Sequence, residues 1–177
     1  MEKKGVVIEV AQEFVYKSGF KYPVLSNLDK EFKRMAAYDM NKYSIIVKPA
    51  RIYQAHRRFN LNLKDYVNIL IARELGRAID TGLVQRREQI DKTFQVINKG
   101  FYSEQVKQYL INLVEEEELE ANKNGRKFIN KDLEKQYDFI GERYVFLETE
   151  SVQSKALIAN LRSKLNNSIE ESIAEIL

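Results

Sequence analysis

The chain contains no cysteine and only one histidine, His56. The lack of cysteine excludes disulfide bonds, thiolate metal sites and cysteine nucleophiles. A single imidazole also excludes any site that needs two histidines. Because it lies in the basic stretch of residues 51–58, we expect His56 to be an ordinary surface histidine.

Long apolar runs are also missing. Near the N-terminus, Val6, Val7 and Ile8 form an apolar run that Glu9 ends, far short of the core of a signal peptide. No other segment approaches the apolar length of a membrane span. The sequence therefore predicts a cytoplasmic protein with no membrane partner.

Sequence motifs of common catalytic and ligand sites are absent as well. The chain has neither a glycine-rich phosphate loop nor a nucleophile elbow. The acidic run at residues 115–118 lacks the alternating loop oxygens and the tight glycine turn of a calcium site, so we expect a solvated helix face there. Nothing in these patterns indicates an enzyme or a cofactor.

The chain does contain ample material for a packed core. Of its 177 residues, 44% are apolar and 31% charged, a composition typical of a folded protein of one compact domain. We expect a domain over residues 1–150, followed by a C-terminal amphipathic helix at residues 151–177. The expected fold class is α+β, predominantly helical.

The apolar pattern predicts one strand and several helices. The β-branched stretch at residues 43–47 predicts a strand, residues 23–29 a loop, and residues 32–37 either a short helix or a strand. Helices are predicted at residues 8–16, 63–79, 84–97, 103–127 and 130–148. Asn62 is the expected N-cap of the second, and Ser103 caps the fourth. The last is expected to continue as a helix, with Gly141 as a candidate interruption.

The helix at residues 63–79 carries a distinctive segment, in which residues 69–80 read I-L-I-A-R-E-L-G-R-A-I-D. This segment resembles the motif helix of small ImmA/IrrE-type zinc peptidases, which carries H-E-L-G-H, a short apolar pair and often an acid. In that helix two histidines four residues apart bind one zinc ion, and the glutamate after the first activates a water. Here Arg73 and Arg77 stand at the two histidine positions, and Glu74 stands at the glutamate position.

A second match follows at residues 118–122, which read E-L-E-A-N and continue to Gly125. They resemble the family's E-x-E-A helix, whose glutamate before the alanine is the third zinc ligand, and Glu120 matches that glutamate. The order of a turn at residues 38–39, an edge strand at residues 43–47 and the motif helix is also similar to the family. The resemblance covers residues 38–128 and implies a small sheet beside a zincin-like motif helix, with helices toward the C-terminus.

The two arginines imply a degenerate member of that family. Arginine is a permanent cation without a lone pair for a metal, so we expect no zinc, no cofactor and no peptidase activity. Without a dication, Glu74 and Glu120 would repel each other unless other cations lie between them. We therefore expect Arg73 or Arg77 to pair with Glu120 in a structural salt bridge. The alternative is that both arginines point outward into a basic groove.

Basic residues also occur beside aromatic residues, a composition that nucleic-acid surfaces use. The candidate contacts are Arg57, Arg58, Arg86 and Arg87. The formal net charge is only +3, from 29 basic and 26 acidic side chains, which favours a solvated basic face instead.

The last predicted segment carries a stripe of five apolar residues at four-residue steps: Leu157, Leu161, Leu165, Ile169 and Ile173. This stripe can pack on its own domain or on a second copy, because an amphipathic helix needs an apolar partner. We expect a homo-oligomer formed through it.

For function, the resemblance implies a non-catalytic module that holds a protein partner in the former substrate groove or on the surface around it. Proteins of this family are frequent in phages and mobile elements, so the resemblance suggests an inhibitor, an anti-repressor or a counter-defence protein. The alternative is a nucleic-acid-binding regulator that uses the basic surface.

Overall fold

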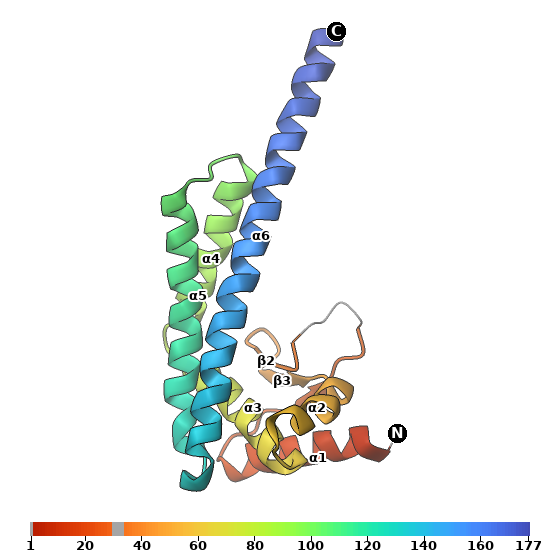
Figure 1. The fold of residues 1–177 in the computed structure, drawn as a ribbon, viewed down its shortest axis with the longest axis vertical. Helices are drawn as coiled ribbons and strands as arrows, with labels where there is room; N and C mark the ends of the chain where they lie inside the picture. The colour runs from red at the N-terminus through yellow and green to blue at the C-terminus, as the bar shows by residue number, and fades with distance from the viewer. Residues whose placement is uncertain (1, 30–33) are drawn as a thin grey trace. The chain divides into compact units, whose positions relative to one another are not determined.

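The computed structural model describes residues 2–29 and 34–177 (Figure 1). The fold is predominantly helical α+β, with one three-stranded sheet, as the sequence predicts. The chain forms two compact units. Unit 1 contains Met1–Asp80 and Glu120–Gly141, and unit 2 contains Thr81–Leu119 and Glu142–Leu177. Residue 150, the predicted boundary, lies within the long helix α6 (Glu134–Ile176).

Unit 1 contains the sheet, which is formed by β1 (Val24–Ser26), β2 (Ala36–Asp39) and β3 (Ser44–Val47). The strand order is β1-β3-β2, with β3 parallel to β1 and antiparallel to β2. The strand predicted at residues 43–47 is confirmed, but its expected position at an edge is wrong, because β3 lies between two partners. β1 lies in the predicted loop, and β2 covers the end of the ambiguous segment 32–37, of which residues 32 and 33 lie outside the described residues.

The helices of unit 1 begin with α1 (Glu2–Lys17), α2 (Pro49–Ala55), the 3-10 turn η1 (His56–Phe59) and α3 (Leu63–Ala78). Helix α3 confirms the prediction, including its N-cap: the Asn62 side chain accepts a hydrogen bond from the Asp65 backbone N–H at 2.8 Å. Helix α3 is the centre of the unit, because nearly all of its residues from Tyr66 to Arg77 are buried. The surrounding core includes Val7, Ala11, Val15, Ile45, Val47 and Ile52.

The remainder of unit 1 comes from later in the chain. It comprises the end of α5 (Glu104–Gly125), the short turns η2 (Arg126–Phe128) and η3 (Lys131–Leu133), and the start of α6. Helix α6 runs through Gly141 without a break, so the expected helix continues there and the candidate interruption is absent. A Cβ at Gly141 would lie 2.9 Å from the Asn122 side chain, so close packing explains the glycine there.

Unit 2 is built from α4 (Leu83–Asn98), residues 104–119 of α5 and residues 142–176 of α6. The three helices lie side by side, and the last turns of α6 extend beyond the turn between α4 and α5 (Figure 1). The helices predicted at residues 84–97 and 103–127 are confirmed, and Ser103 Oγ accepts a hydrogen bond from the Val106 N–H at 3.2 Å. The buried centre of the unit consists of Ile97, Leu110, Val152 and Ala156. Within residues 2–29 and 34–177, no helix is both long and apolar enough to cross a membrane.

Candidate functional site

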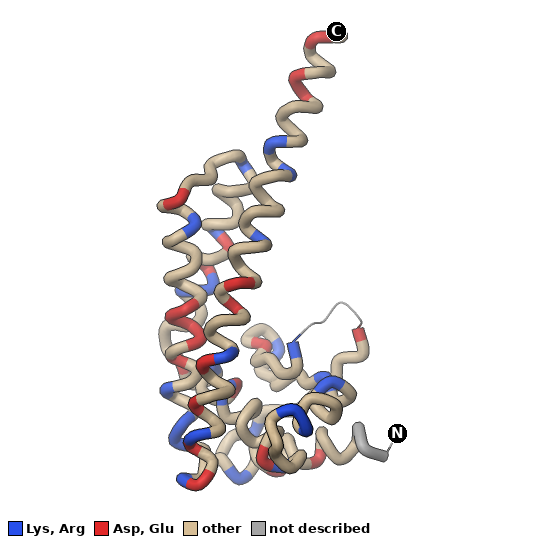
Figure 2. The backbone as a smooth tube through the Cα atoms, in the orientation of Figure 1, with Lys and Arg blue, Asp and Glu red and all other residues tan. Residues whose placement is uncertain are grey.

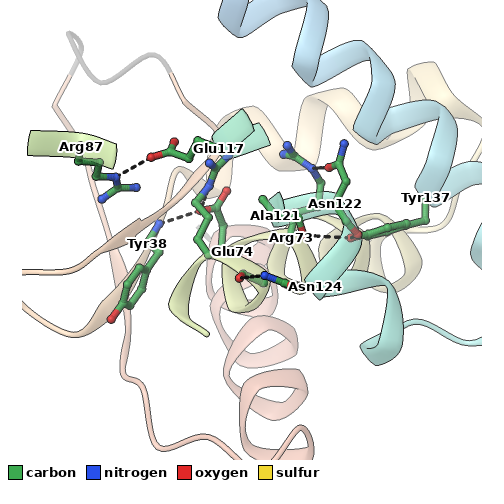
Figure 3. A network of polar contacts seen from close by, with 11 residues as sticks. Tyr38, Arg73, Glu74, Arg87, Glu117, Ala121, Asn122, Asn124 and Tyr137 are labelled. Carbon is green, nitrogen blue, oxygen red and sulfur yellow. Dashed lines mark hydrogen bonds and ion pairs between the residues drawn. The ribbon is translucent and has the colours of Figure 1, made fainter. Parts of the chain in front are cut away.

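The charged residues of the motif helix lie inside unit 1. Arg73, Glu74 and Arg77 are each 2% exposed and are among the buried residues of α3. Figure 3 shows Arg73 and Glu74 with their polar contacts. Charged side chains are almost never buried to this degree unless polar partners compensate for their lost hydration. The contacts of these three residues therefore decide what the site can do.

Glu74 connects α3 to the sheet. Its Oε2 accepts a hydrogen bond from the Tyr38 backbone N–H at 2.8 Å and another from Arg77 Nε at 3.0 Å. The side chains of Arg77 and Glu74 are 2% and 3% exposed, so the ion pair is shielded from water. Breaking such a pair by removing one partner leaves a buried charge uncompensated and costs about 3–5 kcal/mol.

Arg73 connects α3 to the end of α5. Its Nε donates a hydrogen bond to Asn122 Oδ1 at 2.6 Å, and the Tyr137 hydroxyl donates to the Asn122 carbonyl oxygen at 2.6 Å (Figure 3). Burial raises the pKa of Tyr137 above its usual range, so the hydroxyl keeps its proton and remains a donor at neutral pH. Asn122 thus joins three helices, α3, α5 and α6.

Two glycines bring the backbones of α3 and α5 together. A Cβ at Gly76 would lie 2.4 Å from the Ala121 carbonyl oxygen, and one at Gly125 would lie 2.4 Å from the Ala72 carbonyl oxygen. Neither position has room for a side chain. Asn124 Nδ2 also donates to the Gly76 carbonyl oxygen at 3.4 Å. The two segments that carry the sequence resemblance, residues 69–80 and 118–125, therefore meet through Gly76, Ala121 and Gly125.

The expected partner of the arginines occupies a different environment. Glu120 is partly exposed, and it takes part in neither the pair of Arg77 with Glu74 nor the contact of Arg73 with Asn122. The structure thus brings Arg77 and Glu74 together, and the pairing of an arginine with Glu120 stays a prediction. Because Arg73 and Arg77 are buried, they do not point outward into an open basic groove.

The residues at this position do not fit zinc. Arginine stands at two of the three positions that match zinc ligands in the resembled family, and it has no lone pair for a metal. Among the described residues, no three His, Asp or Glu side chains are grouped so that they could hold a metal ion. The carboxylate of Glu74 is buried, and its Oε2 already accepts two hydrogen bonds, so it is not placed to activate a water.

The four candidate nucleic-acid contacts divide between the two units. In unit 1, Arg57 and Arg58 are exposed, and the Arg57 guanidinium lies 5.6 Å from the centre of the Tyr53 ring. In unit 2, Arg86 is 7% exposed, and Arg87 Nε lies 2.9 Å from a Glu117 carboxylate oxygen. Burial and pairing with glutamate make Arg86 and Arg87 poor phosphate contacts.

His56 follows α2 and is partly buried. Its Nδ1 lies 3.0 Å from the Leu61 carbonyl oxygen, so the imidazole is engaged in a local backbone contact. This contact links the first residue of η1 to the loop that follows it.

The apolar stripe of the C-terminal segment lies on the surface of unit 2. Its five residues, Leu157, Leu161, Leu165, Ile169 and Ile173, are 49–60% exposed. Asn160 and Ser163, on the same stretch of α6, are buried. The large apolar side chains therefore do not pack on their own unit.

Three contributors to the buried network were not expected from the sequence. The Tyr38 amide, Asn122 and Tyr137 come from β2, α5 and α6. Only Asn122 carried a signal, because it directly follows the Glu-Ala pair of the second match. Comparison with protein-family models, with curated proteins and with solved structures gives no match for this chain.

Proposed function

We propose that this chain is a non-catalytic protein-binding module on a dismantled zinc-peptidase scaffold. One observation carries the proposal: Arg73, Glu74 and Arg77 are buried and form hydrogen bonds, at the positions of two metal ligands and a catalytic base. A helix held in this way stabilises the fold and has no open position for a metal or a water. Contact between the two segments that resemble the family supports the shared scaffold.

A surface groove in unit 1 is the proposed binding site. The groove has a volume of about 360 Å³ and is lined by residues of η1, of the loop after it and of α6. Phe59 and Phe139 form its aromatic part, with their ring centres 6.4 Å apart, and Phe139 is 60% exposed. We call it the Phe59 groove; its lining is Arg58, Phe59, Asn60, Leu61, Lys135, Gln136, Phe139 and Ile140.

The charges of the Phe59 groove indicate the chemistry of its occupant. Arg58 and Lys135 are the two charged residues that line it, and both are exposed. Nearby on α6, Asp138 lies 3.3 Å from Arg126, so this carboxylate is paired outside the lining. The groove therefore suits a protein segment with a large apolar side chain flanked by carboxylates. Binding of this kind fits the inhibitor, anti-repressor or counter-defence role that the resemblance suggests.

Peptide display on the full chain tests this site. We expect selected peptides to combine a large apolar residue with Asp or Glu, and Phe139→Asp to lower their affinity by at least about tenfold, because interface aromatic residues dominate binding energy. Phe146→Asp is the matched control, because Phe146 is 61% exposed on the same helix but outside the groove. Failure to select any peptide, or equal losses in both variants, would count against the groove.

The same protein can be tested for nucleic-acid binding. Only Arg57 and Arg58, of the four candidates, are exposed, so the structure gives weaker support to this alternative. Binding of duplex DNA or RNA that falls steeply with salt would favour it over the protein-binding proposal, because salt dependence reports phosphate contacts.

A further inference from the structure

The end of α6 carries an apolar stripe that its own unit leaves uncovered. We call residues 157–177 the α6 tail. Six apolar residues form one line along it, with exposed fractions from 48% to 83%. They are Ile158, Leu161, Leu165, Ile169, Ile173 and Ile176; this set, which has Ile158 in place of Leu157 of the predicted stripe and adds Ile176, is the stripe discussed below. From the first to the last, five steps cover 18 residues, about 3.6 residues a step, which is the repeat of the α-helix itself. The stripe is therefore straight.

The opposite side of the tail explains why its own unit does not cover the stripe. The residues of α6 that are buried in unit 2 at this level are small or polar: Ala156, Asn160 and Ser163. A Cβ at Gly100, in the turn between α4 and α5, would lie 3.4 Å from Ser163 Oγ and 3.7 Å from Asn167 Nδ2. Helix α6 thus packs its small and polar residues against unit 2 and leaves its large apolar residues exposed. A contiguous exposed apolar surface of this kind marks an interaction site.

The stripe is symmetric about residue 167. Ile158 and Ile176 lie nine residues on either side of it, Leu161 and Ile173 six residues, and Leu165 and Ile169 two residues. If two copies of the tail lie antiparallel with their residues 167 at the same level, every apolar residue of the stripe faces an apolar residue of the other copy. This symmetry about residue 167 is what pairing with a second copy of the tail requires. Binding to an unrelated partner would not require it.

The charges of the tail also select an antiparallel arrangement. Exposed basic residues, Arg162 and Lys164, precede the centre, and exposed acidic residues, Glu170, Glu171 and Glu175, follow it (Figure 2). Lys164 and Glu171 are seven residues apart, close to two helical turns, so they lie on the same flank of the stripe. An antiparallel pair brings Lys164 of one copy to Glu171 of the other. A parallel pair would instead place the basic segments of the two tails at the same level, and likewise the two acidic segments.

We infer that two copies of this chain associate through their α6 tails as an antiparallel helix pair centred on residue 167. Neither the Phe59 groove nor the proposed function is needed for this pairing, since the groove lies in unit 1 and the stripe in unit 2. Variants of the groove and of the tail are therefore expected to act separately.

Sedimentation equilibrium of the full chain tests the association. We expect twice the mass of one chain at micromolar concentration, and Leu165→Asp to raise the dimer dissociation constant by at least about tenfold, because it places a charge at the centre of the apolar contact. Ala174→Asp is the matched control, because residue 174 is exposed on the tail and is not in the stripe. Phe139→Asp leaves the dimer intact. A monomer at all concentrations, or equal effects of Leu165→Asp and Ala174→Asp, would overturn the proposal.

Disulfide cross-linking tests the direction of the pair, and the lack of native cysteine makes the result clean. When Leu161→Cys and Ile173→Cys chains are mixed and oxidised, we expect cross-linked dimers, because the two positions face each other. Neither variant alone should cross-link, because two copies of residue 161 would be about 18 Å apart along the axis, and a disulfide requires Cα atoms within about 7 Å. Cross-linking of each variant alone, or none in the mixture, would overturn the antiparallel pair.

Discussion

Removal of the Arg77 guanidinium tests the buried ion pair most closely. Arg77→Met keeps an unbranched apolar side chain in a similar space but leaves the Glu74 carboxylate buried without its cation, at a site that is 2–3% exposed. Loss of one partner of such a pair costs about 3–5 kcal/mol, a large part of the stability of a small protein. We therefore expect the free energy of unfolding to fall by about that amount.

A double variant separates the ion pair from the loss of a side chain. In Glu74→Gln/Arg77→Met, the glutamine oxygen can still accept the Tyr38 N–H bond, while no buried carboxylate is left without a cation. We expect the double variant to lose at least about 2 kcal/mol less than the sum of the two single variants, since neighbouring residues in one network couple.

Urea unfolding followed by circular dichroism gives these free energies, with exchange of the Tyr38 amide proton as a local readout. Arg57→Met is the control, because Arg57 is exposed in the same unit and its loss is expected to change stability by about 0.5 kcal/mol or less. A cost for Arg77→Met as small as that of the control, or additive costs in the double variant, would refute the ion pair as a stabilising element.

Three further predictions concern the packing around Gly76, Asn122 and Tyr137. Gly76→Ala should destabilise unit 1 by about 1–3 kcal/mol or more, because its Cβ would lie 2.4 Å from the Ala121 carbonyl oxygen. Gly5→Ala is the control in the same urea assay. A Cβ at Gly5 on α1 would lie in open space, so this variant should be neutral or stabilising by up to about 1 kcal/mol. Tyr137→Phe should cost about 0.5–1.5 kcal/mol at neutral pH, because the hydroxyl no longer donates to the Asn122 carbonyl oxygen. The pKa of Tyr137 is raised in the folded protein, so the free energy of unfolding of the unsubstituted chain should fall as pH rises above about 10. The fall should be smaller in Tyr137→Phe, which lacks the titrating hydroxyl. An equal loss of stability at alkaline pH in both proteins would contradict this.

The regular helices and the central strand could be predicted because their signals are local. Apolar residues at helical spacing and the Asn62 cap defined α3, and β-branched residues between turn residues defined β3. Strand β1 could not be predicted, because its three residues depend on pairing with β3 rather than on a pattern of their own. The predicted edge position of β3 was wrong for the same reason, because strand order depends on nonlocal contacts.

The candidate site was predictable only in part. Helical spacing places Arg73, Glu74 and Arg77 on neighbouring turns of α3, and the structure buries all three. The partners of Glu74 and Arg73 were missed, because one is a backbone N–H of β2 and the other an amide 49 residues away. Gly141 suggested a break because glycine weakens helices, but in α6 it makes room for the Asn122 side chain.

The buried network of Arg73, Glu74 and Arg77 lies at the positions that, by the resemblance to zinc peptidases, correspond to two metal ligands and a catalytic glutamate. Metal analysis of the purified full chain, after incubation with excess zinc and gel filtration, shows whether these positions can hold a metal. We expect no retained zinc, because Arg73 and Arg77 cannot ligate a metal and Glu74 already accepts hydrogen bonds from the Tyr38 N–H and from Arg77. One zinc ion per chain, lost on substitution of Glu74 or Glu120 by alanine, would contradict it.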